Sequence, residues 1–134
     1  MPTGPIVPDT SAWIEFIRGT GSVANARLRA FQQFGADLVV TGPVVMEVLA
    51  GAQREAQRSR ARDLLGRCRY IAVEDPSDYE HAAALYRACR VAGQTLRGQL
   101  DCLIAAVAIR IGAAVLHADS DFDVIARHSP LRIV

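Results

Sequence analysis

The sequence predicts a three-layer α/β domain with a central parallel sheet, and two observations support this fold class. Short apolar segments alternate along the chain with longer segments in which apolar residues recur at helical spacing. Such alternation is typical of strands joined by helical crossovers, which build a parallel sheet covered by helices. The length of 134 residues suits one compact unit, so we expect residues 1–134 to form a single domain.

The first half of the chain is expected to alternate strands and helices, with turn residues between them. Gly35 and Gly42 bound one apolar strand, and Pro43 stands where proline is favoured, in the first turn of a helix that ends near Gly51. Trp13 lies in an apolar helical segment that follows the first strand. The expected elements are strand 6–9, helices 11–18 and 22–34, strand 37–41, helix 43–51 and an arginine-rich helix 55–67.

The second half repeats the alternation and contains the most apolar segment of the chain. Apart from Asp101, the run from Leu100 to Ile109 is almost wholly apolar, which predicts a buried helix that Gly112 ends. The expected elements are strand 69–73, helices 76–92 and 100–109, strand 113–117, helix 119–126 and strand 131–134.

Composition excludes several classes of function. The net charge is +1, and all fifteen basic residues are arginine, so no mechanism that needs a lysine applies. Cys68, Cys89 and Cys102 show no metal-binding spacing and are expected to be buried thiols in a reducing compartment. No apolar run is long enough to span a bilayer, and the first residues lack the basic start of a signal peptide. We therefore expect a cytoplasmic protein with no membrane contact.

Acidic residues occur where the expected strands end. Asp9 closes the first strand, while Asp119 and Asp121 follow the strand 113–117. Glu47 lies on the helix after the second strand, and Asp101 lies at the start of the most apolar helix. Because active sites of open parallel sheets form at the carboxyl ends of the strands, we expect these five acids to meet at one sheet edge.

Glu47 and Asp101 are the most informative of these acids, because each is a carboxylate within an apolar segment. Two carboxylates about 4 Å apart repel by about 4 kcal/mol at an effective dielectric constant of about 20. Arginines or a divalent cation must compensate such a cluster. An all-oxygen site without clustered His or Cys suits Mg²⁺ or Mn²⁺, which can activate water for phosphodiester hydrolysis.

Each acid also has a purely structural interpretation. Asp9 could form an Asx turn after a strand, Glu47 could pair with an arginine, and Asp101 could cap its helix. Asp119 and Asp121 precede or open a helix, where acids suit the helix dipole, and for Asp123 we prefer this interpretation. The joint placement of the acids at one edge favours the functional interpretation for the others.

At this point the sequence resembles the PIN-domain ribonucleases, specifically the VapC-type toxins of toxin–antitoxin pairs. The resemblance covers nearly the whole chain, and the segment Gly93–Arg97 is similar to the mycobacterial branch. The order and spacing of four short motifs carry it: Asp9-Thr10-Ser11-Ala12-Trp13, Val45-Met46-Glu47-Val48-Leu49-Ala50-Gly51, Asp101-Cys102-Leu103-Ile104-Ala105-Ala106 and His117-Ala118-Asp119-Ser120-Asp121-Phe122-Asp123.

The resemblance implies a metal-dependent endoribonuclease that is a homodimer, binds Mg²⁺ or Mn²⁺, cuts RNA such as tRNA and is inhibited by a VapB-type antitoxin. It assigns Asp9, Glu47, Asp101 and Asp119 to the metal, and Asp121 to the catalytic site as an additional ligand or a water-positioning group. Thr10 or Ser11 would hydrogen-bond water at the cation. We expect Arg97 and Arg18 to contact RNA first, and the group Arg54, Arg58, Arg60 and Arg62 second.

Two departures from the family pattern bear on activity. Pro8 precedes Asp9 where an aliphatic residue is usual, and proline removes a donor from the strand. Gly98 stands where related sequences often carry serine. A PIN-like module that binds RNA or antitoxin without cutting is therefore the alternative. A phosphoaspartyl phosphatase or receiver domain is disfavoured, because no lysine is present and Ser11 replaces the second acid that the phosphatase needs.

Overall fold

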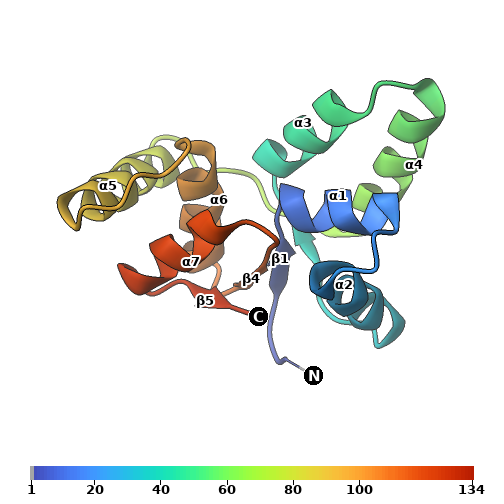
Figure 1. Ribbon diagram of the computed structural model, residues 1–134, viewed down its shortest axis with the longest axis horizontal. Helices are drawn as coiled ribbons and strands as arrows, with labels where there is room; N and C mark the ends of the chain where they lie inside the picture. Colours follow the sequence, from blue (N-terminus) through green and yellow to red (C-terminus); the bar gives the residue numbers. More distant parts are fainter. Residues whose placement is uncertain (1) are drawn as a thin grey trace.

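The computed structural model describes residues 2–134 and confirms the predicted alternation of strands and helices (Figure 1). Strands are shorter than predicted, and helix ends differ by one residue or so. In order, the elements are β1 Ile6–Pro8, α1 Thr10–Arg18, α2 Val23–Gln33, β2 Val39–Val40, α3 Gly42–Gly51, α4 Glu55–Gly66, β3 Arg69–Tyr70, α5 Ser77–Val91, α6 Leu100–Arg110, β4 Ala114–Leu116, α7 Ser120–Arg127 and β5 Arg132–Ile133.

The strands are all parallel and lie in the spatial order β3-β2-β1-β4-β5. One sheet joins β1, β4 and β5, and a second joins β2 and β3. A parallel bridge between Ile6 and Leu38 connects the two. The chain winds outward from β1 in one direction through β2 and β3 and in the other through β4 and β5. The point where the order reverses therefore lies between β1 and β4, where open α/β sheets bind ligands.

Pro8 explains why the sheet is weakly joined at β1 and β2. Ile6 donates its N–H to the Asp37 carbonyl at 2.9 Å on the β2 side, and Asp9 donates to the Leu116 carbonyl at 2.9 Å on the β4 side. Since these groups alternate sides along a strand, the nitrogen of Pro8 faces β2 and has no hydrogen to donate. The β4 side is unaffected, so pairing with β4 fixes the position of Asp9.

Helices cover the sheet on two sides (Figure 1): α5, α6 and α7 lie on one side, and α1 to α4 lie on the other. The interior is continuous between these layers, and Trp13, Leu28, Ile104 and Phe122 are all fully buried. Every residue from 102 to 108 of α6 is buried, which confirms the prediction of a buried helix. Burial of a large apolar side chain contributes about 1.5–3 kcal/mol, so α6 is the main hydrophobic support of this layer.

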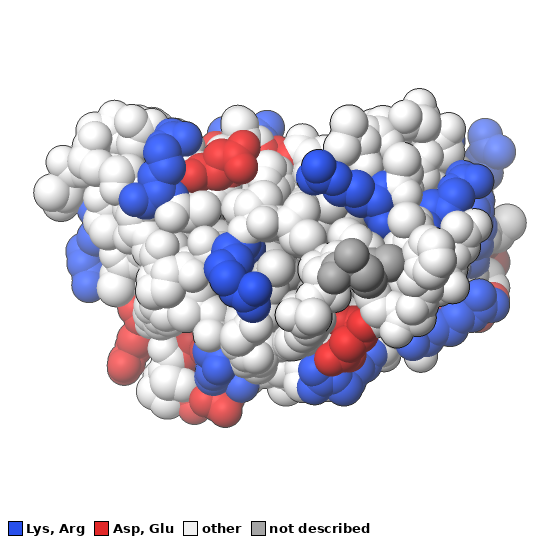
Figure 2. Space-filling model, turned by 90° about the horizontal axis from the view of Figure 1, so that it is seen from below, with Lys and Arg blue, Asp and Glu red and all other residues white. Residues whose placement is uncertain are grey.

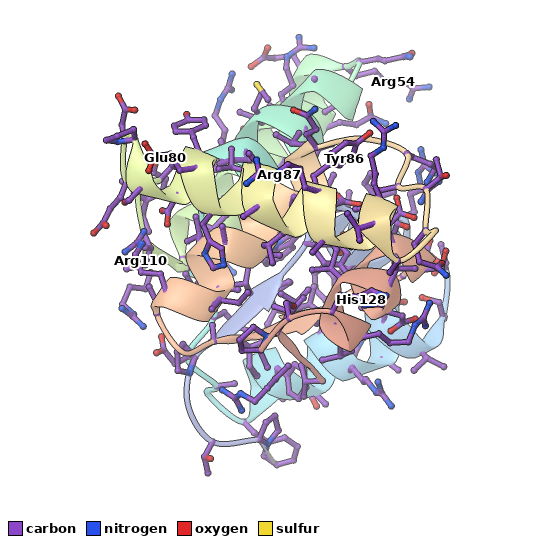
Figure 3. All side chains as sticks on the ribbon, turned by 90° about the vertical axis from the view of Figure 1, so that its left-hand side faces the viewer. Arg54, Glu80, Tyr86, Arg87, Arg110 and His128 are labelled. Atoms are coloured by element: carbon purple, nitrogen blue, oxygen red, sulfur yellow. The ribbon has the colours of Figure 1, made fainter. Side chains whose placement is uncertain are left out.

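The outermost helix of this layer, α5, packs on α6 (Figure 3). Where α5 begins, the buried carboxylate of Asp78 accepts hydrogen bonds from Arg110 at the end of α6, with the Nη2 contact at 2.9 Å, and from the Glu74 N–H at 2.8 Å. The ion pair between Asp78 and Arg110 was not predicted from the sequence, and it fixes one end of α5 on α6.

The surface carries no single-sign field on the face nearest the chain ends, where Figure 2 shows basic and acidic side chains interspersed. The thiols of Cys89 and Cys102 are buried and Cys68 is half-buried, and all three are free, as expected. Within residues 2–134, none of the helices is both long and apolar enough to cross a membrane.

Candidate active site

The predicted acids converge at the carboxyl ends of β1 and β4, at the point where the strand order reverses. Asp9 directly follows β1, and Asp119 lies three residues after the end of β4. The helix α6 runs into β4, so its first turn, with Asp101, lies at the same edge. Carboxylate oxygens of Asp101, Asp119 and Asp121 all lie within 4.8 Å of one another. Two chain segments, the start of α6 and the segment after β4, thus place three acids within reach of one cation. Asp9 and Glu47 lie close enough for their charges to raise the pKa of Asp101.

Asp9 is 2% exposed and caps α1 as well as facing the cluster. Its Oδ1 accepts hydrogen bonds from the Ala12 N–H at 3.0 Å and from the Ser11 hydroxyl at 2.7 Å. Burial raises the pKa of this carboxyl, and these hydrogen bonds oppose that rise. The capping interpretation and the site interpretation therefore hold together: the cap orients Asp9.

Glu47 is half-buried on α3, across from the first residue of α1. The Thr10 hydroxyl donates to its Oε1 at 2.6 Å. Among residues 2–134, Glu47 has no arginine partner, so the ion-pair interpretation of this residue is wrong. Thr10 therefore orients the carboxylate without neutralising it.

Asp101 is the least compensated acid of the cluster. The helix cap of α6 is Gln99, and Asp101 lies inside the first turn, so the capping interpretation is wrong. Across the described part of the chain, its carboxylate has no side-chain ion pair. Burial first, and then the nearby Asp119, Asp9 and Glu47 carboxylates, raise the pKa of Asp101 to about 7. Burial and like charge both disfavour the ionised form of this carboxyl.

Arg97 is the counter-ion of Asp119 and Asp121. Its Nη2 forms a close ion pair with Asp119 Oδ1, and its Nε lies 3.5 Å from Asp121 Oδ2. The backbone N–H of Arg97 donates to the same Asp121 oxygen at 3.1 Å. Asp119 also caps α7, because its Oδ1 accepts the Asp121 N–H at 3.0 Å. Arg97 therefore reaches the site, as predicted, but contacts acids within it.

Sequence reasoning missed a supporting role for His117. Its Nδ1 accepts the Asp119 N–H at 3.0 Å, so the hydrogen resides on Nε2, which donates to Asp123 Oδ1 at 3.0 Å. The Ser11 hydroxyl also accepts the Ala118 N–H at 2.8 Å, which ties the end of β1 to the end of β4. The clustering of polar residues in 117–123 was the available signal. Asp123 serves here as a support rather than a site acid.

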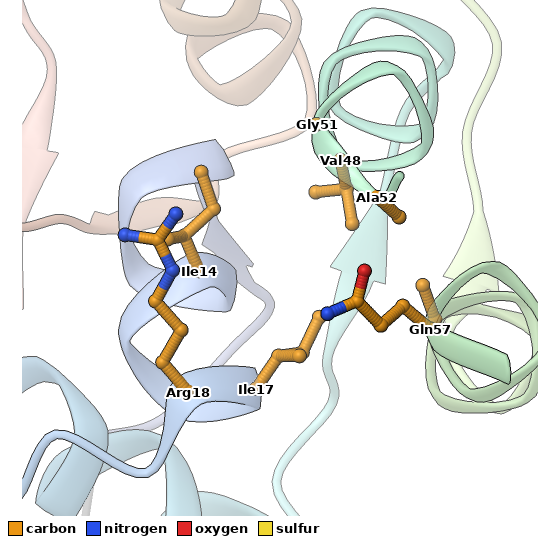
Figure 4. A pocket seen from close by; sticks show the side chains of 8 residues that line it. Ile14, Ile17, Arg18, Val48, Gly51, Ala52 and Gln57 are labelled. Atoms are coloured by element: carbon orange, nitrogen blue, oxygen red, sulfur yellow. The ribbon is translucent and has the colours of Figure 1, made fainter. Parts of the chain in front are cut away.

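The other predicted RNA contacts lie away from the acids. Arg18 ends α1, eight residues and about 12 Å of helix beyond Thr10. It borders an apolar groove of about 130 Å³ between α1, α3 and α4 (Figure 4). The groove is lined by Ile14, Ile17, Arg18, Val48, Gly51, Ala52, Gln57 and Ala61.

The arginines of α4 are largely engaged in local contacts. Arg58 and Arg62 lie 3.1 Å and 3.6 Å from the Glu55 carboxylate, and Arg60 donates to the Ile17 carbonyl at 3.3 Å. Arg54 precedes the helix as its cap residue. None of the ion pairs described for residues 2–134 links this group to the acid cluster.

The second departure, Gly98, leaves the site intact. A Cβ atom built at Gly98 meets no atom within 4 Å, so serine would fit there and glycine removes no packing contact. The donor set of the cluster consists of carboxylate oxygens that could hold a cation. These residues fit Mg²⁺ or Mn²⁺, which prefer oxygen ligands.

Comparisons with known proteins agree with this geometry. The model of the PIN domain family matches residues 6–128. Ribonuclease VapC11 of Mycobacterium tuberculosis and VapC ribonuclease Mb1587 of Mycobacterium bovis are each 43% identical over 128 residues, which cover 95% of this chain and 96% of each relative.

Solved structures show the same fold at low sequence identity. VapBC2 from Rickettsia felis, bound to a promoter DNA fragment, superposes with a TM-score of 0.77 at 17% identity, covering 98% of both chains. VapC20 of M. tuberculosis, a toxin that cleaves the sarcin–ricin loop, gives 0.71 at 17% identity over 95% of this chain and 98% of that one. With the family model and the mycobacterial relatives, these findings show that the chain belongs to the PIN-domain family, in its VapC ribonuclease branch.

Proposed function

We propose that the protein is a Mg²⁺- or Mn²⁺-dependent endoribonuclease toxin that hydrolyses phosphodiester bonds in RNA. One observation carries the proposal: Asp101, Asp119 and Asp121 cluster at the switch point of the sheet, and the charges of Asp9 and Glu47 act on Asp101. Within residues 2–134, arginine compensates only Asp119 and Asp121 of these five acids. A structural role would favour full compensation, because unpaired buried charge is costly. The relatives named as ribonucleases support RNA as the substrate class.

Asp9, Asp101 and Asp119, with Glu47, would hold the cation. Oxygens of Asp101 and Asp119 lie within 4.8 Å of each other, and the charges of Asp9 and Glu47 act on Asp101. The bound cation would polarise the phosphodiester and lower the pKa of water for in-line attack. Of the chain's own groups, Thr10 fixes the rotamer of Glu47 through the 2.6 Å bond, and Ser11 fixes that of Asp9. These hydroxyls hold acceptors in place before substrate arrives, which lowers the cost of assembling the reactive geometry.

Glu47 or Asp121 would orient the attacking water and accept its proton. The hydrogen bond from Thr10 uses Oε1 of Glu47, and the contacts from Arg97 use Oδ2 of Asp121, so each carboxylate has a second oxygen for the water. Hydrolysis of this kind leaves a 5′-phosphate and a 3′-hydroxyl. A 2′,3′-cyclic phosphate would mean attack by the ribose hydroxyl and would exclude this mechanism.

The direct test is incubation of purified protein with total RNA and Mn²⁺. We expect cleavage with 5′-phosphate ends, and its loss in Asp9→Ala and Asp101→Asn. RNA binding without cleavage by the unaltered protein would support the alternative, a PIN-fold module that captures RNA or antitoxin without cutting. Mapping 5′ ends in RNA from expressing cells would identify the substrate, for which we propose a structured cytoplasmic RNA, first among them tRNA.

We also propose a VapB-type antitoxin as partner, with an apolar helix of the antitoxin in the groove between α1, α3 and α4. Several structural relatives are VapBC complexes, which supports this class of partner. The groove is lined by Ile14, Ile17 and Val48, whose apolar side chains suit an apolar helix. Ile17→Asp should weaken inhibition by the co-expressed antitoxin, and unaltered inhibition would refute this placement.

We propose that the chain forms a homodimer, as the resemblance implies. Large apolar side chains on helices from the middle of the chain are exposed, including Met46 on α3 and Val91 on α5. Light scattering of the purified protein tests this proposal, and a monomer at micromolar concentration would contradict it.

A further inference from the structure

The segment between α5 and α6 brings one arginine onto the acid cluster. The Arg97 guanidinium contacts both Asp119 and Asp121. Oxygens of Asp101, Asp119 and Asp121 lie within 4.8 Å of one another. The positive charge of Arg97 therefore already pairs with two of these three carboxylates. A guanidinium stays protonated throughout the working range of pH, so this charge cannot be removed by titration.

We propose that Arg97 is an internal counter-ion of the metal-free site and that a divalent cation exchanges with it for the oxygens of Asp119 and Asp121. This inference rests on the proposed function, because it requires that the acids bind a cation. It extends that function by giving the same arginine two positions: on the acids before the cation binds, and released beside the site afterwards.

The exchange follows from the charges and atoms involved. A cation bound by Asp119 and Asp121 would share the two carboxylates that Arg97 now contacts, because Mg²⁺ takes carboxylate oxygens as direct ligands. Two positive groups on the same carboxylates repel each other, and this repulsion favours release of the more mobile one. Asp101, which Arg97 does not pair with, stays available as the first ligand that an incoming cation meets.

The side chain of Arg97 can leave without unfolding its segment. The side chain is 73% exposed, so its release creates no cavity. The neighbouring Leu96 is 4% exposed and anchors the backbone in the core. The backbone N–H of Arg97 holds Asp121 separately, at 3.1 Å. Released, the guanidinium lies next to the cluster and is suited to bind an RNA phosphate, because its fork of donors matches phosphate oxygens.

The first experiment measures Mn²⁺ affinity by electron paramagnetic resonance on the full chain. Removing the competitor in Arg97→Ala should tighten Mn²⁺ binding about 3-fold to 10-fold, the range expected for loss of two solvent-exposed ion pairs. Arg97→Lys, which retains one charge and loses the fork, should give an intermediate affinity. Arg90→Ala is the matched control, because Arg90 stacks on the Tyr86 ring at 5.9 Å. The Mn²⁺ affinity of Arg90→Ala should stay within about 2-fold of that of the unaltered protein.

A second experiment observes the guanidinium itself. The Arg97 Nε–H resonance is assigned as the one absent from Arg97→Lys, and Mg²⁺ is then added to saturation. We expect this resonance to lose its protection from solvent exchange. A resonance that stays protected at saturation, or equal or weaker Mn²⁺ affinity in Arg97→Ala, would overturn the exchange.

The outcomes also separate this inference from the proposed function. Tighter Mn²⁺ binding by Arg97→Ala supports the exchange even if no RNA is cut. Equal affinities together with Mn²⁺-dependent cleavage refute the exchange and leave the nuclease standing. Absence of Mn²⁺ binding by the unaltered protein and by Arg97→Ala refutes both.

Discussion

Two acids on the helix pair α5 and α6 have opposite environments. Asp78 is almost fully buried, and its carboxylate accepts hydrogen bonds from Arg110 and from the Glu74 N–H. Burial opposes ionisation of Asp78, but these bonds outweigh it and lower the pKa. Burial and the charges of the Asp119, Asp9, Glu47 and Asp121 carboxylates raise the pKa of Asp101 on α6 to about 7. One acid belongs to a structural ion pair, and the other has no ion-pair partner within residues 2–134, as expected for the proposed cation ligand.

The environments of Asp78 and Asp101 distinguish an acid with a structural role from an acid with a functional role. Each carboxylate lies in the first turn of its helix, where the macrodipole favours negative charge. Asp78 and Asp101 therefore have the same position in their helices, and they differ in whether an arginine pairs with the carboxylate. Stability selects the arrangement at Asp78, whereas the cost of holding Asp101 against four other acids is retained only where binding a ligand offsets it.

The largest expected effect is on catalysis. Asp101→Asn removes a proposed metal ligand and should lower the rate of RNA cleavage by about 10²-fold to 10⁴-fold. Asp78→Asn should leave the rate per folded molecule unchanged. Asp63→Asn makes the same chemical change at an exposed position on α4 and is the control. If Asp101→Asn cuts RNA at the normal rate, the two acids are not different in the way proposed.

The next effect is on stability. Arg110→Ala leaves Asp78 buried without its partner and should lower the free energy of unfolding by about 3 kcal/mol, as measured by urea denaturation. The double variant Asp78→Asn with Arg110→Met removes both charges and should recover most of that loss. Failure of the double variant to recover stability would show that geometry at this position, rather than uncompensated charge, determines the cost.

The pH dependence of the free energy of unfolding tests the raised pKa of Asp101. Since the folded pKa of Asp101 lies above its unfolded value of 3.8, its contribution is present below about pH 4 and is lost as the pH rises through about 7. In EDTA, Asp101→Asn should therefore be more stable than the unaltered protein by about 1–2 kcal/mol at pH 8, a value reduced for solvent screening. This difference in the free energy of unfolding should be smaller at pH 5. A gap that is the same at both pH values would contradict the raised pKa.

The smallest effect concerns Pro8. Pro8→Val restores an N–H on the β2 side of β1, and the net gain of one hydrogen bond is about 0.5–1 kcal/mol, part of which the greater freedom of the unfolded chain offsets. Thermal unfolding measures this change. Mn²⁺ affinity should stay the same, because the Asp9 N–H bonds to Leu116 on the other side. Altered affinity would mean that Pro8 does move Asp9.

Local sequence patterns were sufficient to predict most of the fold. The apolar run after Leu100 predicted the buried α6, and Pro43 and Gly51 predicted the limits of α3, because these signals act within a few residues. Strand lengths were overestimated, since a strand ends where its neighbour stops pairing. At β2 that limit is set by a proline in another strand, which the local pattern of 37–41 does not contain.

The candidate acids and the sheet edge where they lie could be predicted from the sequence alone, because parallel strands that alternate with helices bring their carboxyl ends together. The way each acid is compensated became visible only in the folded structure. Arg110 pairs with Asp78 over 32 residues of chain, and the Arg97 backbone N–H bonds to Asp121 over 24. Asp101 receives no such partner within residues 2–134. Charge compensation depends on distances of a few ångströms between elements, and local sequence patterns do not specify those distances.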